Sequence, residues 1–525
     1  MRHLLERFGG FLPAAIALTL PIVFIPTASD SYILPRASIV IAGASIGVGI
    51  ALLLPGGPSL GALRWPLLAA AGAALLAFAT SVSWPLSLAG SYTRYESLPM
   101  RLSYLGLLAS SVWLLRSPRQ RDLLVAGFVL GTSIACFKAW LQWVFQLPFR
   151  PDGDLGNANL LAALTVMAIP LALDRARRGT PFAAAWAAAV LVMGAGLLFT
   201  TSRSGGLGVI AGCLALLAFA VPRRFGLAVG GGAAAMVGIV LAVMLASPLR
   251  ILNNDPPELR LHLWGDGLRM VAARPLTGWG EDATGLSFGR FLSQDYASLV
   301  TFDRIHSGPL DVAATQGVLG LAALGWVLFV VFRTAWRSRS QPYVAGLGAA
   351  LVGFSVWVAF NFDWSPATGA FWLLTGAIWS AASPSPASGE QSEGAGSASM
   401  TGSARRVGVR GAKEVRAGTA VVLVLAAVLF AVFPVLADVW YLKGRADLSV
   451  NVDPLQAQYH WALGSIEELR RAAALGETEP GFYVALGDRE LQLGNRAKAQ
   501  SAYQRALEID PYYTPATQRL AALRP

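Results

Sequence analysis

The chain has 525 residues, of which 55% are hydrophobic and 14% are charged, and its mean hydropathy is +0.54. This composition excludes an ordinary soluble enzyme and predicts an all-α, polytopic integral membrane protein. The formal net charge is +11. The basic residues lie in short loops between apolar segments, so this charge indicates membrane topology and does not favour a nucleic-acid partner.

Thirteen apolar segments are long enough to cross a bilayer, which takes roughly 20 helical residues. The first follows Arg2, His3 and Arg7 as a signal peptide would, but no small-residue cleavage site follows it, so we expect it to be retained. Twelve segments form the predicted core, and the thirteenth is an additional span. In chain order they are 11–29, 35–55, 66–88, 99–115, 122–145, 157–173, 182–201, 204–221, 225–247, 308–332, 343–361, 366–382 and 417–437.

Every second loop between these segments is rich in arginine. Basic loops beside membrane spans lie on the cytoplasmic side. The N-terminus is therefore predicted to be cytoplasmic, and the alternate loops and the C-terminal region to be extracytoplasmic. The basic loops contain Arg64; Arg116, Arg119 and Arg121; Arg175, Arg177 and Arg178; Arg223 and Arg224; Arg333, Arg337 and Arg339; and Arg405, Arg406, Arg410, Lys413 and Arg416.

Breaks in the apolar pattern divide the chain into domains. The membrane domain is predicted at 1–382 and carries a long polar outer loop at 248–307. A stretch rich in Ser, Gly and Ala opens a flexible cytoplasmic linker at 383–416. The additional span at 417–437 then leads to a region of soluble character at 438–525.

Residues 481–513 have the spacing of a 34-residue tetratricopeptide repeat. An upstream copy at 459–475 is degenerate, and one repeat cannot bury its own faces, so we expect two or more helix pairs between about 440 and 525. Because the matching residues are packing residues, we expect this domain to recruit or position a protein partner. The matching residues are Tyr483, Leu486, Gly487, Ala499, Tyr503, Ala506 and Pro511.

Two arginines on the predicted outer side run against the positive-inside trend. Arg203 lies in the tight turn TTSRSGG, where its guanidinium either binds an anionic substrate or reaches a lipid phosphate. Arg260 shares a helical stripe with Trp264, Leu268 and Val271. That stripe fits either a site cation on an apolar face or an interfacial helix anchored by Trp and Arg.

His306 and Arg94 lie on the same side as these arginines. A lone histidine before a helix is more often a cap or a surface residue than a catalyst. The positive end of the predicted 308–332 helix lowers the pKa of His306, however, and keeps the imidazole in the neutral form that accepts a proton. One neutral base beside cations suits a reaction with a phosphate-bearing leaving group. Arg94 is a weaker candidate because it can pair with Glu96.

The outer segment PDGDLGN places Asp152 and Asp154 at the spacing with which nucleotide-sugar transferases hold a divalent metal. Nucleotide sugars are scarce outside the membrane, so we interpret this segment as a turn. No other group of His, Asp and Glu has metal-ligand spacing. We therefore expect neither a metal nor another cofactor.

His306, Ser307, Gly317 and Gly320 fit the pattern H-[NSQ]-x9-G-x-x-[GTY]. In this pattern the sequence resembles the O-antigen ligase and Wzy polymerase superfamily. Three further segments resemble its other landmarks in the same order, and the resemblance covers roughly 90–360. Each motif alone is weak, but their order and shared outer placement strengthen the match. The three segments are 156–173, 201–208 and 260–280.

The resemblance implies metal-independent transfer of a glycan from a polyprenyl-pyrophosphate lipid, such as undecaprenyl pyrophosphate, to an acceptor hydroxyl. The reaction is expected at the outer face of the bacterial inner membrane. Arg203 and Arg260 match the arginines that hold the donor pyrophosphate, for which bidentate guanidinium contacts are well suited. His306 matches the residue that serves the acceptor. Trp264 and Arg94 are further candidates.

One position departs from the superfamily, because relatives often carry an acidic residue where this chain has Thr315. Asp311 and Asp303 are alternative carboxylates that can orient the imidazole, and the sequence does not choose between them.

Several activities share this scaffold. We slightly favour a ligase for lipopolysaccharide or another surface polysaccharide, and leave open a Wzy-type polymerase and a protein O-oligosaccharyltransferase. A lipid-linked glycan flippase is the alternative from another class. Transporters place their sites near the membrane midplane, however, whereas the polar landmarks here lie on the outer face.

Overall fold

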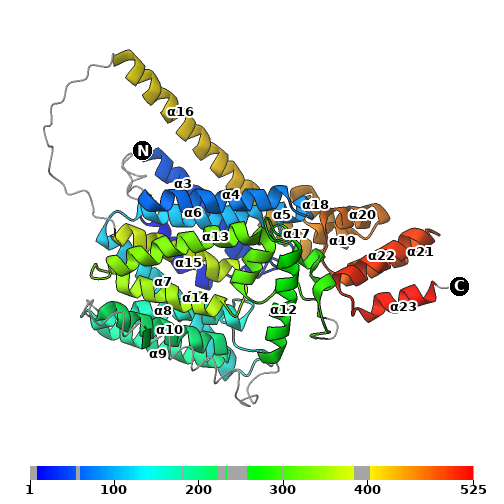
Figure 1. The fold of residues 1–525 in the computed structure, drawn as a ribbon, viewed down its shortest axis with the longest axis horizontal. Coiled ribbons are helices and arrows are strands. Elements are labelled where there is room, and N and C mark those ends of the chain that lie inside the picture. Colours follow the sequence, from blue (N-terminus) through cyan, green and yellow to red (C-terminus); the bar gives the residue numbers. More distant parts are fainter. Residues whose placement is uncertain are drawn as a thin grey trace.

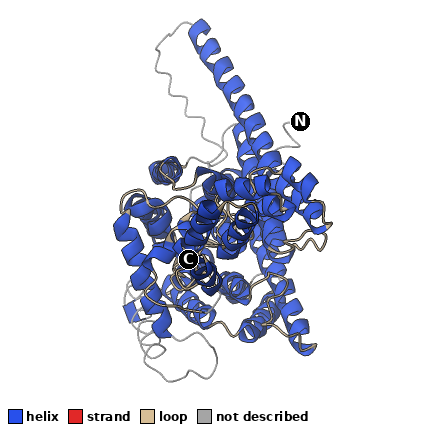
Figure 2. Ribbon diagram, turned by 90° about the vertical axis from the view of Figure 1, so that its right-hand side faces the viewer, coloured by secondary structure: helices blue, strands red, loops and turns tan. Residues whose placement is uncertain are grey.

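The computed structural model describes residues 9–54, 60–179, 182–221, 231–232, 257–297, 300–382 and 402–523. Within these ranges the chain is helical and contains no strand, as predicted from its composition (Figures 1 and 2). The predicted span at 225–247, apart from residues 231–232, and linker residues 383–401 lie outside the described residues.

Long apolar helices form one bundle (Figure 1). In the described part of the chain, eight helices are long and apolar enough to cross a membrane, which supports a multi-pass membrane protein. The helices of the bundle are α2 (Leu12–Ile22), α3 (Ile33–Leu53), α4 (Arg64–Ala79), α5 (Trp84–Ala89), α6 (Leu98–Leu114), α7 (Pro118–Val144), α8 (Ala158–Arg177), α9 (Ala183–Thr200), α10 (Arg203–Ala220), α13 (Gly308–Arg337), α14 (Val344–Val358) and α15 (Ser365–Ala382).

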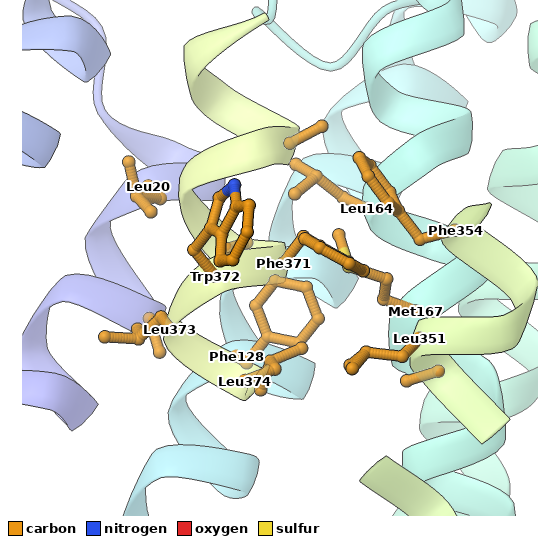
Figure 3. Packing of buried hydrophobic residues seen from close by; sticks show 14 of the residues in the cluster. Leu20, Phe128, Leu164, Met167, Leu351, Phe354, Phe371, Trp372, Leu373 and Leu374 are labelled. Carbon is orange, nitrogen blue, oxygen red and sulfur yellow. The ribbon is translucent and has the colours of Figure 1, made fainter. Parts of the chain in front are cut away.

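Helix α15 lies at the centre of the bundle, and Figure 3 shows its side chains between those of neighbouring helices. Phe371 stacks on Phe354 of α14 with ring centroids 4.6 Å apart. Small residues bring other helices closer: a Cβ added to Gly208 of α10 would lie 3.0 Å from the carbonyl oxygen of Gly353 in α14. Close backbone approach at small residues is how helices associate in a membrane, where van der Waals packing replaces the hydrophobic driving force.

Two predicted spans differ from the structure: the helix within 11–29 is shorter than predicted, and the span at 66–88 is interrupted. Helix α2 already ends at Ile22. The predicted span at 66–88 is divided at 80–83, between α4 and α5. There Val82 N donates to the carbonyl oxygen of Trp279 at 3.1 Å. This bond connects the break to the outer loop, so the 66–88 interruption has a tertiary cause that hydropathy does not reveal.

The last span is longer than predicted. It comprises α16 (Gly402–Ala427), a π-helical turn η5 (Val428–Val432) and α17 (Phe433–Leu442), and it leaves the bundle at an angle (Figure 1). Helix α16 therefore begins inside the segment that we expected to be a linker, 383–416. It packs on α3, where Gly49 lies beside Ala420.

The outer loop contains α12 (Pro257–Ala273) and two short 3₁₀ turns, η3 (Thr284–Leu286) and η4 (Phe288–Phe291). Helix α12 lies across the end of the bundle (Figure 1), as expected of an interfacial helix. The predicted stripe is wrong in part, because Leu268 is 56% exposed. The buried apolar side chains of α12 are instead Leu263 and Met270, which pack with Ile305.

The C-terminal region is a series of short helices: α18 (Ala446–Val452), α19 (Ala457–Leu463), α20 (Ile466–Leu475), α21 (Pro480–Gln492), α22 (Arg496–Ile509) and α23 (Thr514–Ala522). Helices α21 and α22 pack so closely that a Cβ on Gly487 would lie 2.3 Å from the Tyr503 ring. The assignment of this C-terminal region to the tetratricopeptide repeats remains a prediction.

A reporter fused after residue 340 is expected to be cytoplasmic, and one fused after residue 525 extracytoplasmic. The alternation of basic loops motivates this prediction, and the N-terminal end and the C-terminal helices lie at opposite ends of the bundle (Figure 1). Paired phosphatase and fluorescent-protein fusions measure both locations. If both reporters are cytoplasmic, the last span does not cross the membrane.

Candidate functional site

Helix α13 is broken at Gly317, and the outer loop fills the break. Gly317 has φ 69° and ψ −171°, a conformation that is open essentially to glycine alone. Trp279 N donates to the carbonyl oxygen of Ala314 at 2.8 Å, and Gly280 N to that of Thr315 at 3.0 Å. These bonds satisfy carbonyl groups that the break would otherwise leave buried without a partner.

Sterics add a second reason for glycine at this position. A Cβ on Gly317 would lie 2.2 Å from the carbonyl oxygen of Leu276, and one on Gly278 would lie 2.4 Å from the carbonyl carbon of Thr315. Val318 N completes the junction by donating to the carbonyl oxygen of Pro275 at 2.7 Å. The helix and the loop that follows α12 are therefore fastened backbone to backbone.

His306 lies directly before the outer half of this helix, in a left-handed conformation with φ 58°. Its Nδ1 is 3.2 Å from the carbonyl oxygen of Arg304. A carbonyl group only accepts hydrogen bonds, so Nδ1 carries the proton and Nε2 keeps its lone pair in the neutral ring. Burial, followed by the positive charge of Arg260, lowers the pKa of His306 below its usual 6.5. This direction is the one predicted from the sequence, and burial is its largest cause.

Two aromatic rings enclose the imidazole. Phe362 meets it edge to face with centroids 5.1 Å apart, and Phe302 lies tilted against it at 5.8 Å. The rings limit how the imidazole can turn and reduce the water around it, which strengthens electrostatic interactions there.

Neither carboxylate proposed from the sequence bonds the imidazole. Asp311 is buried and accepts the N–H of Ile305 at 2.8 Å. This bond anchors residues 300–307, the histidine loop, to α13. Asp303 forms a bidentate pair with Arg94 instead, at 2.9 and 3.1 Å. The predicted pairing of Arg94 with Glu96 is therefore wrong, since Glu96 accepts from the Tyr104 hydroxyl at 2.7 Å.

The loop between α14 and α15 connects the site residues, and sequence reasoning missed it. Arg260 donates to the carbonyl oxygen of Phe360 at 2.5 Å, and Asn361 donates to Ser204 at 2.9 Å. The ring of Phe362 faces both His306 and the guanidinium of Arg94, the latter at 4.9 Å. The available signal was the sequence FNFDW, which places polar and aromatic residues at the end of the predicted span 343–361 and just before the next one.

Arg203 and Arg260 approach this loop from different helices. Arg203 is the first residue of α10, immediately before Ser204, which contacts the loop, and its side chain is half-buried. Among the described residues it has neither a hydrogen-bonding nor an ion-pairing partner for its guanidinium. Trp264 stands one turn after Arg260 and packs on the Phe360 ring at 5.7 Å. The fold thus brings Arg260, Trp264, Arg94 and His306 to one loop and places Arg203 next to a residue that contacts it.

Behind the histidine lies a buried ion cluster that the sequence analysis did not find. Arg101 of α6 contacts Glu281 at 3.0 Å and Asp363 at 2.9 Å, and Gln316 of α13 donates to Glu281. Burial raises the pKa of Glu281. Arg101, Gln316 and Asp363 also line a cavity of about 60 Å³ between α4, α6 and α13. An arginine inside a predicted span was the signal available for this cluster.

No group of three or more possible metal ligands occurs among the described residues. Asp152 accepts from Gln142 at 3.0 Å, and Asp154 pairs with Lys138 at 2.9 Å. Their carboxylates therefore already have partners on α7, as expected for a structured turn.

Together these features define a helical membrane protein in which Arg94, Arg260 and His306 gather around the loop between α14 and α15. Residues 188–325 match the family model described as O-Antigen ligase (Wzy_C), which supports a place in the O-antigen ligase superfamily and a glycan ligase or polymerase type of activity. The matched range includes Arg203, Arg260, His306 and Gly317. A search of curated proteins found no match to the chain.

Proposed function

We propose that the protein transfers a glycan from a polyprenyl-pyrophosphate lipid to an acceptor hydroxyl at the extracytoplasmic face of the bacterial inner membrane. The observation that carries this proposal is the position of His306, whose Nδ1 lies 3.2 Å from the carbonyl oxygen of Arg304, so that in the neutral ring Nε2 is the nitrogen that accepts a proton. Arg260 and His306 both contact the loop between α14 and α15, Arg260 at the carbonyl oxygen of Phe360 and His306 at the ring of Phe362, so the two side chains can face the same substrate.

In the proposed step, the acceptor oxygen attacks the anomeric carbon of the donor sugar and gives its proton to Nε2 of His306. The bond between that carbon and the pyrophosphate oxygen breaks, and the electron pair leaves with the polyprenyl pyrophosphate. Arg203 and Arg260 stabilise the charge that develops on this leaving group, because the planar guanidinium matches phosphate oxygens in a bidentate manner.

We favour a surface-polysaccharide ligase over a polymerase or a protein O-oligosaccharyltransferase. The C-terminal helices contact the outer loops at Asp30, Tyr92 and Gly90, and this placement suits an enzyme that distinguishes a large acceptor. A flippase is disfavoured because the histidine and the outer arginines cluster in loops rather than in the middle of the bundle.

The test measures donor binding and transfer side by side, on purified protein with a defined polyprenyl-pyrophosphate glycan and candidate lipid, glycan and protein acceptors. Arg203→Lys and Arg260→Lys keep the charge but lose the planar fork, so each is expected to weaken donor binding and to slow transfer. Arg269→Lys is the matched control on α12, because Arg269 pairs with Asp266 and is exposed. Normal donor binding in both site variants would contradict the assigned role.

Transfer is expected to persist in EDTA, since arginines rather than a metal neutralise the leaving group in this proposal. The measurement is turnover before and after chelation, followed by addition of magnesium or manganese. Activity that is lost and then restored by either ion would require a metal site, with Asp152 and Asp154 as the first residues to mutate.

A further inference from the structure

The C-terminal helices rest directly on the outer loops of the membrane domain. In α17, the carboxylate of Asp438 accepts the backbone N–H of Asp30 at 2.7 Å and the hydroxyl of Tyr92 at 2.8 Å. Beyond α18, Gln456 donates to the carbonyl oxygen of Gly90 at 3.4 Å. The region is therefore held at several points along the outer surface, and a long linker does not separate it from the bundle.

Two glycines show how close this contact is. Gly476, with φ 92°, lies against α5, where an added Cβ would stand 2.7 Å from Ser83 Oγ and 3.2 Å from Leu86 Cβ. Gly289 in η4 lies against the end of α22, where an added Cβ would stand 2.1 Å from the carbonyl oxygen of Ile509. At both places the backbone of one partner is in contact with the other.

The segment 476–479 is a rigid turn between α20 and α21. The buried carboxylate of Glu477 accepts the N–H groups of Thr478 and Glu479 at 2.8 and 3.1 Å. The hydroxyl of Tyr483 donates to the carbonyl oxygen of Glu477 at 2.9 Å. These bonds fix the turn internally, so it can support what lies against it.

The 3₁₀ turn η3 lies between this turn and the histidine loop. A Cβ on Gly285 would stand 3.6 Å from Thr478 Cγ2 on one side and 3.3 Å from Asp303 Cβ on the other. The hydroxyl of Thr284 donates to the carbonyl oxygen of Asp303 at 3.0 Å. Burial, followed by the charge of Asp303, raises the pKa of Glu479, as its position near the Arg94–Asp303 pair requires.

We infer that the C-terminal region is a positioning element for His306: the turn 476–479 supports η3, and η3 holds Asp303, three residues before the histidine. Recruitment of a partner is therefore not its only role. The effect on transfer rests on the proposed function, whereas the ordering of the histidine loop does not. Separating the C-terminal region from the outer loops should increase the mobility of residues 300–307 even where no substrate is present.

The experiment uses the full chain with Gly289→Leu, Gly476→Leu and the double variant, each of which places a side chain in a contact that has no room for it. Amide hydrogen exchange is measured over 300–307, together with donor binding and transfer to a small soluble acceptor. We expect exchange of the histidine loop to rise about tenfold or more in the double variant, and transfer to fall by a similar factor. Donor binding should change little, because Arg203 and Arg260 lie on α10 and α12.

The matched controls are Gly494→Leu and Gly265→Leu. Gly494 shares a positive φ with Gly476, and Gly265 lies in the outer loop like Gly289, but a Cβ at either control position meets nothing within 4 Å. Unchanged exchange of 300–307 in the double variant would overturn the inference, as would equal loosening in the controls. If exchange rises while the wild type transfers no glycan, the proposed chemistry fails and the positioning role stands.

Discussion

Replacement of His306 by alanine is expected to lower glycan transfer by about 10²–10⁴-fold, the usual cost of losing a general base. Donor binding should be retained, because the imidazole acts on the acceptor and the guanidinium groups hold the donor. Both quantities are measured on the same purified variant. His262→Ala is the control, since His262 is exposed on α12. Near-normal transfer by a folded His306→Ala protein would reduce the histidine to a structural residue.

The pH dependence of transfer gives a second measurement of the same residue. Only the neutral imidazole accepts a proton, and burial with the charge of Arg260 holds the pKa of His306 below 6.5. The rate is therefore expected to decline as pH falls and the ring becomes protonated, with the midpoint of the decline below pH 6.5. A decline with its midpoint above pH 7 would disagree with the half-buried position of this histidine near Arg260.

Gly317→Ala is expected to produce the largest loss of stability among single substitutions in α13. The new Cβ would meet the carbonyl oxygen of Leu276 at 2.2 Å, and the backbone conformation itself costs a non-glycine residue about 1–3 kcal/mol. The measurement is the midpoint of thermal unfolding in detergent, together with transfer. We expect a lower midpoint and weak transfer, because the displaced loop carries Glu281 and leads on to the histidine.

Gly325→Ala is the matched control in the same helix. A Cβ at Gly325 meets nothing within 4 Å. Alanine in a helix interior is about 0.5–1 kcal/mol more favourable than glycine, so this variant should be at least as stable as the wild type. Equal midpoints for the two variants would show that the break at Gly317 does not govern the stability of α13.

Hydropathy was sufficient to predict an all-helical membrane bundle, because a bilayer imposes long apolar segments whatever their neighbours are. It failed where tertiary contacts decide the local structure. The interruption after α4 depends on a bond from Val82 to Trp279, almost two hundred residues away, and the break in α13 depends on the loop that enters it. Helix α16 begins earlier than predicted for another reason. Its first residues follow a stretch rich in Ser, Gly and Ala, and this composition led us to expect a linker as far as residue 416.

The candidate site shows the same division. Spacing identified Arg203, Arg260 and His306 because each stands in a short motif that the chain carries in a fixed order. The partners of those residues were not predictable, since Phe360 and Phe362 come from a connection 100 and 56 residues distant from Arg260 and His306. Arg94 was paired with its sequence neighbour, and the fold chose Asp303 instead. Short motifs therefore predict the candidate site residues but not the residues that contact them in the fold.

The connection between α14 and α15 has a consequence for how this protein can vary. Four successive residues contact four different parts of the molecule. Phe360 accepts a hydrogen bond from Arg260, and Asn361 donates one to Ser204. Phe362 packs on the ring of His306, and Asp363 forms an ion pair with Arg101. Each residue depends on the one before it to face the correct direction. Inserting or deleting a single residue here would exchange every partner at once, whereas a replacement affects one. We therefore expect a change in the length of this connection to disrupt the candidate site more than any single substitution within it.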